Sequence, residues 1–165
     1  MKAAAALSLL FAACAGAPLD RETGPATFED FVGDWRGTMR IAGGPEVRMS
    51  LEVAPVAGEV DRFHWRLQYG EQAVRDYTLV ISDRERGAAA VDENNGIVLP
   101  TLLRGRELIS VFEVQGNVID IRYRLEPGGL AFSLESFPLD KAEDAGKDVR
   151  AWTRVAVQRG FLTRS

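Results

Sequence analysis

The chain of 165 residues contains only one cysteine, Cys14, and only one histidine, His64. A single cysteine excludes an intrachain disulfide, and a single histidine excludes a metal site with two histidine ligands. His64 stands between Phe63 and Trp65 at an outward position of a predicted strand, which does not favour a Ser-His-Asp triad. The motifs G-x-S-x-G, G-x-x-x-x-G-K-[ST] and G-x-G-x-x-G are also absent. The sequence therefore predicts no catalytic residue, metal or cofactor.

The chain has fewer basic than acidic residues, with 20 Lys and Arg residues and 24 Asp and Glu residues, and its formal net charge is -4. The arginines are scattered along the chain and interleaved with acids, as on solvated strand faces. A surface that neutralises phosphates is not indicated, so no nucleic-acid partner is expected. Hydrophobic residues make up 46% of the chain, which suits one domain that buries a core.

Long apolar runs are missing except at the N-terminus, where the segment 3–13 is too short to span a bilayer. Lys2 precedes this run and small residues follow it, which is the layout of a secretory signal peptide over residues 1–17. The polar residues 18–26, with a Gly-Pro pair, are typical of a linker. We therefore expect an exported bacterial protein, located in the periplasm or on the outer membrane as a lipoprotein.

Two interpretations of Cys14 stay open. The segment "FAAC" resembles a bacterial lipobox, in which small residues precede a cysteine that is lipidated, although Phe11 stands where such signals usually have leucine. Ordinary signal-peptide cleavage at "ACA" or "AGA" would instead discard Cys14. A lipid anchor on Cys14 is the only membrane contact that the sequence indicates.

From Trp35 onward, apolar and polar residues alternate in short runs, with the period of a strand that has one dry face and one wet face. The segments "RMSLEVAPV" and "RFHWRLQYG" show this alternation clearly. Turn residues such as Asn95-Gly96 and Gly116-Asn117 separate the runs at the spacing typical of all-β folds. Pro100 predicts a strand that is interrupted or lies at an edge.

This pattern predicts an all-β domain over residues 27–160, an antiparallel up-and-down β-barrel of about ten strands. A short helical turn over "TFEDFVG", with Thr27 as its cap, would precede the first strand. The segment "VRAWTRVAVQ" would form the last strand after the charged loop "DKAEDAGKD", and residues 161–165 would form a tail. An immunoglobulin-like sandwich is the structural alternative.

Phe31, Gly33 and Trp35 form an F-x-G-x-W pattern at the start of the first strand. Gly33 would allow a sharp bend, and the indole of Trp35 would close one end of the barrel with its N–H bonded to a carbonyl. The pattern resembles the calycins, the superfamily of lipocalins and fatty-acid-binding proteins. The resemblance implies that a basic residue of the last strand, Arg154 or Arg159, packs across the tryptophan. Some calycins bind haem through a histidine inside the barrel, but His64 is at an outward position of its strand, so haem is not expected.

The inward positions of the predicted strands are mostly apolar, with a few hydroxyl groups among them. Such an interior suits a small hydrophobic or amphipathic ligand, for which we predict contacts with Tyr69, Tyr77, Phe112 and Tyr123. Small barrels are also packed solid with side chains, which would suit an envelope protein that interacts through its outer face. A third hypothesis is an isomerase or lyase, which would require the inward tyrosines to converge with an arginine.

The loop "VDENNGIVL" is the densest group of acids and amides. Asp92 would accept backbone N–H bonds in a tight turn. The functional interpretation is that Asp92, Asn94 and Asn95 surround the mouth of the barrel and touch the ligand. An EF-hand calcium loop does not match, because the alternating acids and the terminal glutamate are missing.

Overall fold

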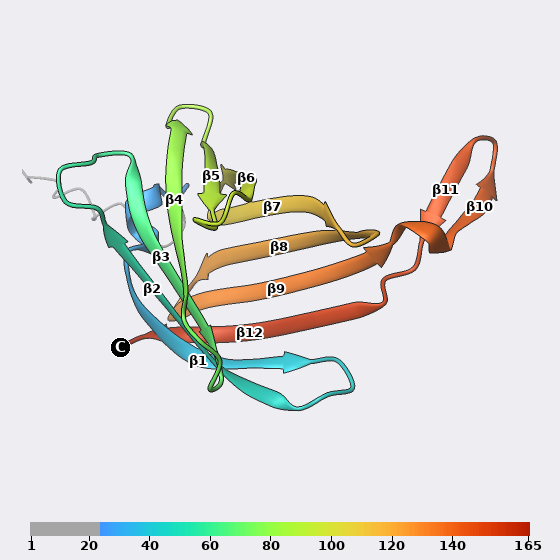
Figure 1. The fold of residues 1–165 in the computed structure, drawn as a ribbon, viewed down its shortest axis with the longest axis horizontal. Coiled ribbons are helices and arrows are strands. Elements are labelled where there is room, and N and C mark those ends of the chain that lie inside the picture. Colours follow the sequence, from blue (N-terminus) through green and yellow to red (C-terminus); the bar gives the residue numbers. More distant parts are fainter. Residues whose placement is uncertain (1–23) are drawn as a thin grey trace, which may run out of the picture.

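A computed structural model describes residues 24–165 of the chain, so the predicted signal peptide, Cys14 and most of the predicted linker lie outside the described residues. Within these residues, ten strands close into an antiparallel barrel, which confirms the predicted fold class (Figure 1). These strands are β1 (Gly33–Ile41), β2 (Glu46–Pro55), β3 (Arg62–Tyr69), β4 (Arg75–Asp83), β5 (Ala88–Asp92), β6 (Val98–Arg104), β7 (Glu107–Val114), β8 (Asn117–Glu126), β9 (Gly129–Pro138) and β12 (Ala156–Arg164).

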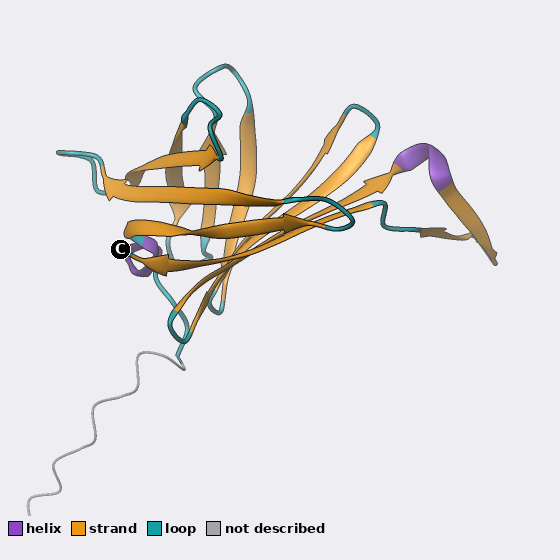
Figure 2. Cartoon of the chain, turned by 90° about the horizontal axis from the view of Figure 1, so that it is seen from below, coloured by secondary structure: helices purple, strands orange, loops and turns teal. Residues whose placement is uncertain are grey.

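Each barrel strand pairs with its neighbour in sequence, except that β12 returns between β9 and β1 and closes the barrel. Two 3-10 turns complete the described part, η1 (Phe28–Phe31) and η2 (Leu139–Lys141). Figure 2 places η1 at the end of the barrel where β12 ends, and η2 at the base of a projecting hairpin. The core consists of the inward residues of the strands, as the period-two alternation predicts, together with Phe28 and Phe31 of η1.

The projecting hairpin consists of β10 (Ala142–Gly146) and β11 (Val149–Trp152), which pair only with each other (Figure 1). The segment predicted as a charged loop is therefore mostly a strand, and the segment predicted as the last strand is divided between β11 and β12. The barrel also extends to Arg164, through residues predicted as a tail. Leu162 is fully buried between β1 and β9, so this end of the chain completes the closure.

Pro100 lies inside β6 and pairs with Ala90 of β5. The ladder between β6 and β7 is short and begins only at the pair of Leu102 with Ile109. The missing N–H of Pro100 therefore falls on a stretch of β6 that has no backbone partner on the β7 side. Just beyond the ladder, the buried hydroxyls of Thr101 and Ser110 lie 2.7 Å apart and hydrogen-bond to each other. These two side chains connect β6 and β7 where their backbones stop pairing.

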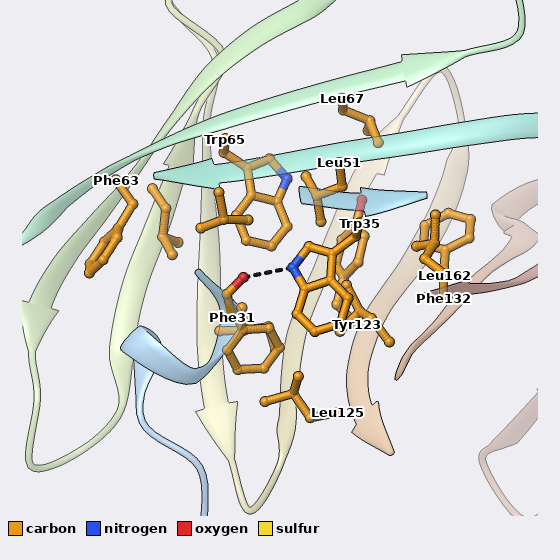
Figure 3. Packing of buried hydrophobic residues seen from close by; sticks show 14 of the residues in the cluster. Phe31, Trp35, Leu51, Phe63, Trp65, Leu67, Tyr123, Leu125, Phe132 and Leu162 are labelled. Carbon is orange, nitrogen blue, oxygen red and sulfur yellow. Dashed lines mark hydrogen bonds between the residues drawn. The ribbon is translucent and has the colours of Figure 1, made fainter. Parts of the chain in front are cut away.

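One end of the barrel is closed by Trp35 and the turn η1. The indole N–H of Trp35 donates a hydrogen bond of 2.8 Å to the carbonyl of Phe31, and both side chains are buried (Figure 3). The backbone of Gly33 has a φ of 148°, a region that favours glycine, at the bend between η1 and β1. An indole in this place fills the end of the barrel and satisfies its own polar atom.

The arginine across Trp35 is Arg164, whose guanidinium carbon lies 4.5 Å from the indole centroid. Arg164 also donates a hydrogen bond of 3.0 Å to the carbonyl of Asp30, which connects β12 to η1. Arg154 and Arg159 do not occupy this position, because both form ion pairs with Glu135. Arg154 precedes β12, and Arg159 has the outward parity, whereas Arg164 shares the inward parity of Leu162. Arg164, and not Arg154 or Arg159, is therefore the basic residue of the last strand that packs across Trp35.

Candidate ligand-binding cavity

A cavity of about 280 Å³ lies inside the barrel. Its walls come from β3 to β9, and most of the contributing side chains are apolar. The lining residues are Trp65, Leu67, Tyr69, Arg75, Tyr77, Val91, Glu93, Leu99, Ser110, Phe112, Val114, Ile119, Ile121, Tyr123 and Leu134. Trp35 does not line the cavity, so the closed end and the cavity are separate parts of the interior.

The four residues predicted to contact a ligand, Tyr69, Tyr77, Phe112 and Tyr123, all line this one cavity. They come from β3, β4, β7 and β8, so only the closure of the barrel brings them together. Their inward positions follow from the alternation of their strands, which the sequence shows. That they share a space left unfilled by side chains is a property of the tertiary structure.

The cavity has a buried end and an open end. Trp65 and Tyr123 are buried, and their rings meet edge to face with centroids 5.0 Å apart (Figure 3). At the other end, the side chain of Val114 is 46% exposed, and Arg75 is also exposed to solvent. An apolar molecule could therefore enter beside Val114 and Arg75 and extend toward the aromatic pair.

The tyrosines supply neutral hydroxyl groups to this cavity. Burial raises the pKa of Tyr69 to about 12, and burial likewise raises the pKa of Tyr123 well above its usual value. Both hydroxyls therefore keep their protons at neutral pH and can donate hydrogen bonds as well as accept them. Such groups orient a polar part of a ligand without adding charge to the apolar wall.

Arg75 and Glu93 are lining residues that the sequence analysis did not assign to a site. Arg75 and Asp76 point to opposite faces of β4, as adjacent strand residues must. The Asp76 carboxylate binds Arg66 at 3.2 Å, whereas the Arg75 guanidinium carbon lies 5.1 Å from the centroid of the Tyr69 ring. Arg75 lies two residues before Tyr77 in β4, so the two side chains point to the same face of the strand. This spacing was the sequence signal that Arg75 faces the interior of the barrel.

The loop after β5 has mainly a turn role. The Asp92 carboxylate accepts a hydrogen bond of 2.8 Å from the backbone N–H of Asn94, whose φ is 56°. Of this loop, Glu93 lines the cavity, whereas Asp92, Asn94 and Asn95 do not. The side-chain amide of Asn95 donates a hydrogen bond of 3.1 Å to the Glu93 carboxylate. The loop therefore contributes one carboxylate to the lining.

Two further observations concern residues 24–165. No group of three or more His, Cys, Asp or Glu side chains in this range is placed to hold a metal ion. No helix in the same range has the length and apolar character needed to cross a membrane.

No protein-family description matches the chain, and no curated protein matches it in sequence. Among solved structures, a protein of unknown function of the DUF3598 family from Nostoc punctiforme is similar, with a TM-score of 0.61 and 14% identity. The match covers 92% of this chain and 53% of that protein, so the chain spans about half the length of that relative. A mutant of the fluorescent protein UnaG matches over 83% of this chain and 97% of its own, with a TM-score of 0.47 and 16% identity. The DUF3598 likeness supports the barrel fold.

Proposed function

We propose that this protein binds a small hydrophobic or amphipathic molecule inside its barrel. The observation that carries the proposal is the open-ended, mostly apolar cavity with three tyrosine side chains in its wall. Ligand sites are typically apolar, with a few polar groups that fix orientation, and have volumes of ~300–1,000 Å³. A cavity of about 280 Å³ is near the lower limit of this range, so we expect a ligand smaller than most drug molecules.

The cavity also bears on the other hypotheses. An envelope protein with a solid barrel would require a filled core, and this core contains a cavity. An isomerase or lyase would require inward tyrosines next to an arginine, and Tyr69, Tyr77, Tyr123 and Arg75 do line one cavity. Neutral hydroxyls and a guanidinium could polarise a carbonyl group, so an enzyme is a second candidate. NMR spectra of a bound carbonyl compound over time distinguish the two, because only an enzyme produces new ligand signals.

We expect Ile121→Trp to weaken ligand binding without unfolding the barrel. Ile121 lines the cavity from β8, and a larger ring in this position would occupy space that a ligand needs. Octanol is a suitable neutral probe, and NMR titration would report both its affinity and the residues that it contacts. We expect the affinity to fall by at least about tenfold, which corresponds to ~1.4 kcal/mol.

The matched control is Val111→Trp, because Val111 is an exposed residue of β7. This substitution adds the same indole to the outside of the barrel and should leave octanol binding unchanged. The proposal would be contradicted if octanol changed the NMR chemical shifts only of residues on the outer face of the barrel. A folded Ile121→Trp variant with the octanol affinity of the wild type would also contradict it.

We also propose that the protein is a calycin-like barrel that is exported and anchored through Cys14. The support is the order of Lys2, the apolar run and "FAAC" in the sequence, together with the F-x-G-x-W pattern. A Cys14→Ala variant should move from the membrane fraction to the soluble fraction when the cells that express it are fractionated. An unchanged distribution would exclude the lipid anchor.

A further inference from the structure

Arg75 brings a positive charge to the open end of the cavity without a partner of opposite charge. Within residues 24–165 it forms no salt bridge, and its guanidinium lies over the ring of Tyr69, 5.1 Å from the centroid. Most other arginines on the strands pair with acids, as Arg66 does with Glu52 and Asp76. In a chain with more acids than bases, an arginine that faces the cavity and forms no ion pair is available to a ligand.

From this arrangement we propose that Arg75 selects ligands that carry a carboxylate, with the carboxylate at the open end and the apolar chain directed toward Trp65 and Tyr123. This inference rests on the proposed function. A guanidinium matches a carboxylate through two parallel hydrogen bonds. The Tyr69 ring holds the guanidinium at the mouth of the cavity, and the buried aromatic pair provides an apolar surface for the chain.

Glu93 sets the charge that such a site accepts. Its carboxylate lines the same cavity and accepts a hydrogen bond from Asn95. It repels an anion that binds to Arg75, because like charges in one site disfavour each other. The site is therefore suited to a head group with one negative charge, and removal of the Glu93 charge should strengthen its binding.

Octanoate and octanol form the decisive pair of probes, because they share an eight-carbon chain and differ in the charged head group. We expect the wild-type protein to bind octanoate about tenfold more tightly than octanol, since hydrogen bonds to charged groups exceed those to neutral groups. Arg75→Gln should remove this preference, because the octanoate affinity falls about tenfold relative to that of octanol. Glu93→Gln should increase octanoate affinity, and Arg36→Gln, at an exposed outward position of β1, is the matched control.

The possible outcomes separate this inference from the proposed function. If octanol binds but octanoate is not preferred, or if Arg75→Gln keeps the preference, the role of Arg75 is refuted and ligand binding stands. If neither probe binds, the proposed function fails and this inference fails with it. Contacts measured by NMR between the octanoate methyl group and Trp65 would support the orientation, whereas contacts between that methyl group and Arg75 would refute it.

Discussion

Gly37→Ala is expected to prevent closure of the barrel. Gly37 lies at an inward position of β1 opposite Leu162 of β12, the pair of strands that closes the structure. A Cβ atom on Gly37 would lie 2.0 Å from the carbonyl oxygen of Phe161 and 2.9 Å from the Cα atom of Leu162. Both contacts involve backbone, which cannot rotate away as a side chain could. The strands would have to separate, and we expect a loss of more than about 4 kcal/mol in the free energy of unfolding.

Urea denaturation followed by circular dichroism measures this loss, and a protein that does not fold at all also fits the expectation. Gly24→Ala is the matched control, because a Cβ atom on Gly24 would meet nothing within 4 Å. Its free energy of unfolding should change by less than about 0.5 kcal/mol. A Gly37→Ala protein as stable as the control would show that β1 and β12 are not packed as closely as described.

Trp35→Ala has the second largest expected effect, a loss of about 3–5 kcal/mol in the free energy of unfolding. The side chain of Trp35 is only 4% exposed, so its removal leaves a cavity at the closed end of the barrel. The substitution also removes the indole N–H that donates a hydrogen bond to the Phe31 carbonyl, and the ring that Arg164 packs against. Trp35→Phe should cost less, because it keeps an aromatic ring and loses mainly the hydrogen bond. Thermal or urea unfolding of both variants measures the difference.

Trp152 offers a matched control for this prediction, because it lies on the projecting β11 and is 44% exposed. Trp152→Ala should change the free energy of unfolding by less than about 1 kcal/mol. Arg164→Gln and Arg154→Gln test which arginine stabilises Trp35. Only the first should destabilise the barrel, by about 0.5–1 kcal/mol, the size of an exposed cation–π contact. Equal losses in Trp35→Ala and Trp152→Ala would contradict the role of Trp35 in closing the barrel.

The sequence by itself determined the class of fold and the faces of the strands. The alternation that directs Trp65 and Leu67 inward and His64 outward is local, because neighbouring side chains of an extended chain point in opposite directions. Turn residues such as Asn95-Gly96 are local signals as well, and they mark where one strand ends and the next begins. Fold class and inward residues could therefore be predicted from short segments.

Predictions that required the length of a strand or its pairing were less accurate. The sequence prediction placed Arg164 in a tail of residues 161–165, beyond the end of the last strand. Its strand forms because β1 and β9 pair with it on both sides, which no local pattern shows. The hairpin of β10 and β11 was missed for a similar reason, since its charged residues resemble those of a loop and its strands are stabilised by pairing with each other.

Only the tertiary structure decided which inward residues share a space and whether that space is filled. Tyr69, Arg75 and Tyr123 lie on three strands, and the closure and stagger of the barrel bring them to one cavity. The cavity is the volume that remains after all side chains are packed, a sum over the whole interior that no segment contains. The sequence thus determined the chemistry of the interior, and the packing of the closed barrel decided where that chemistry can meet a ligand.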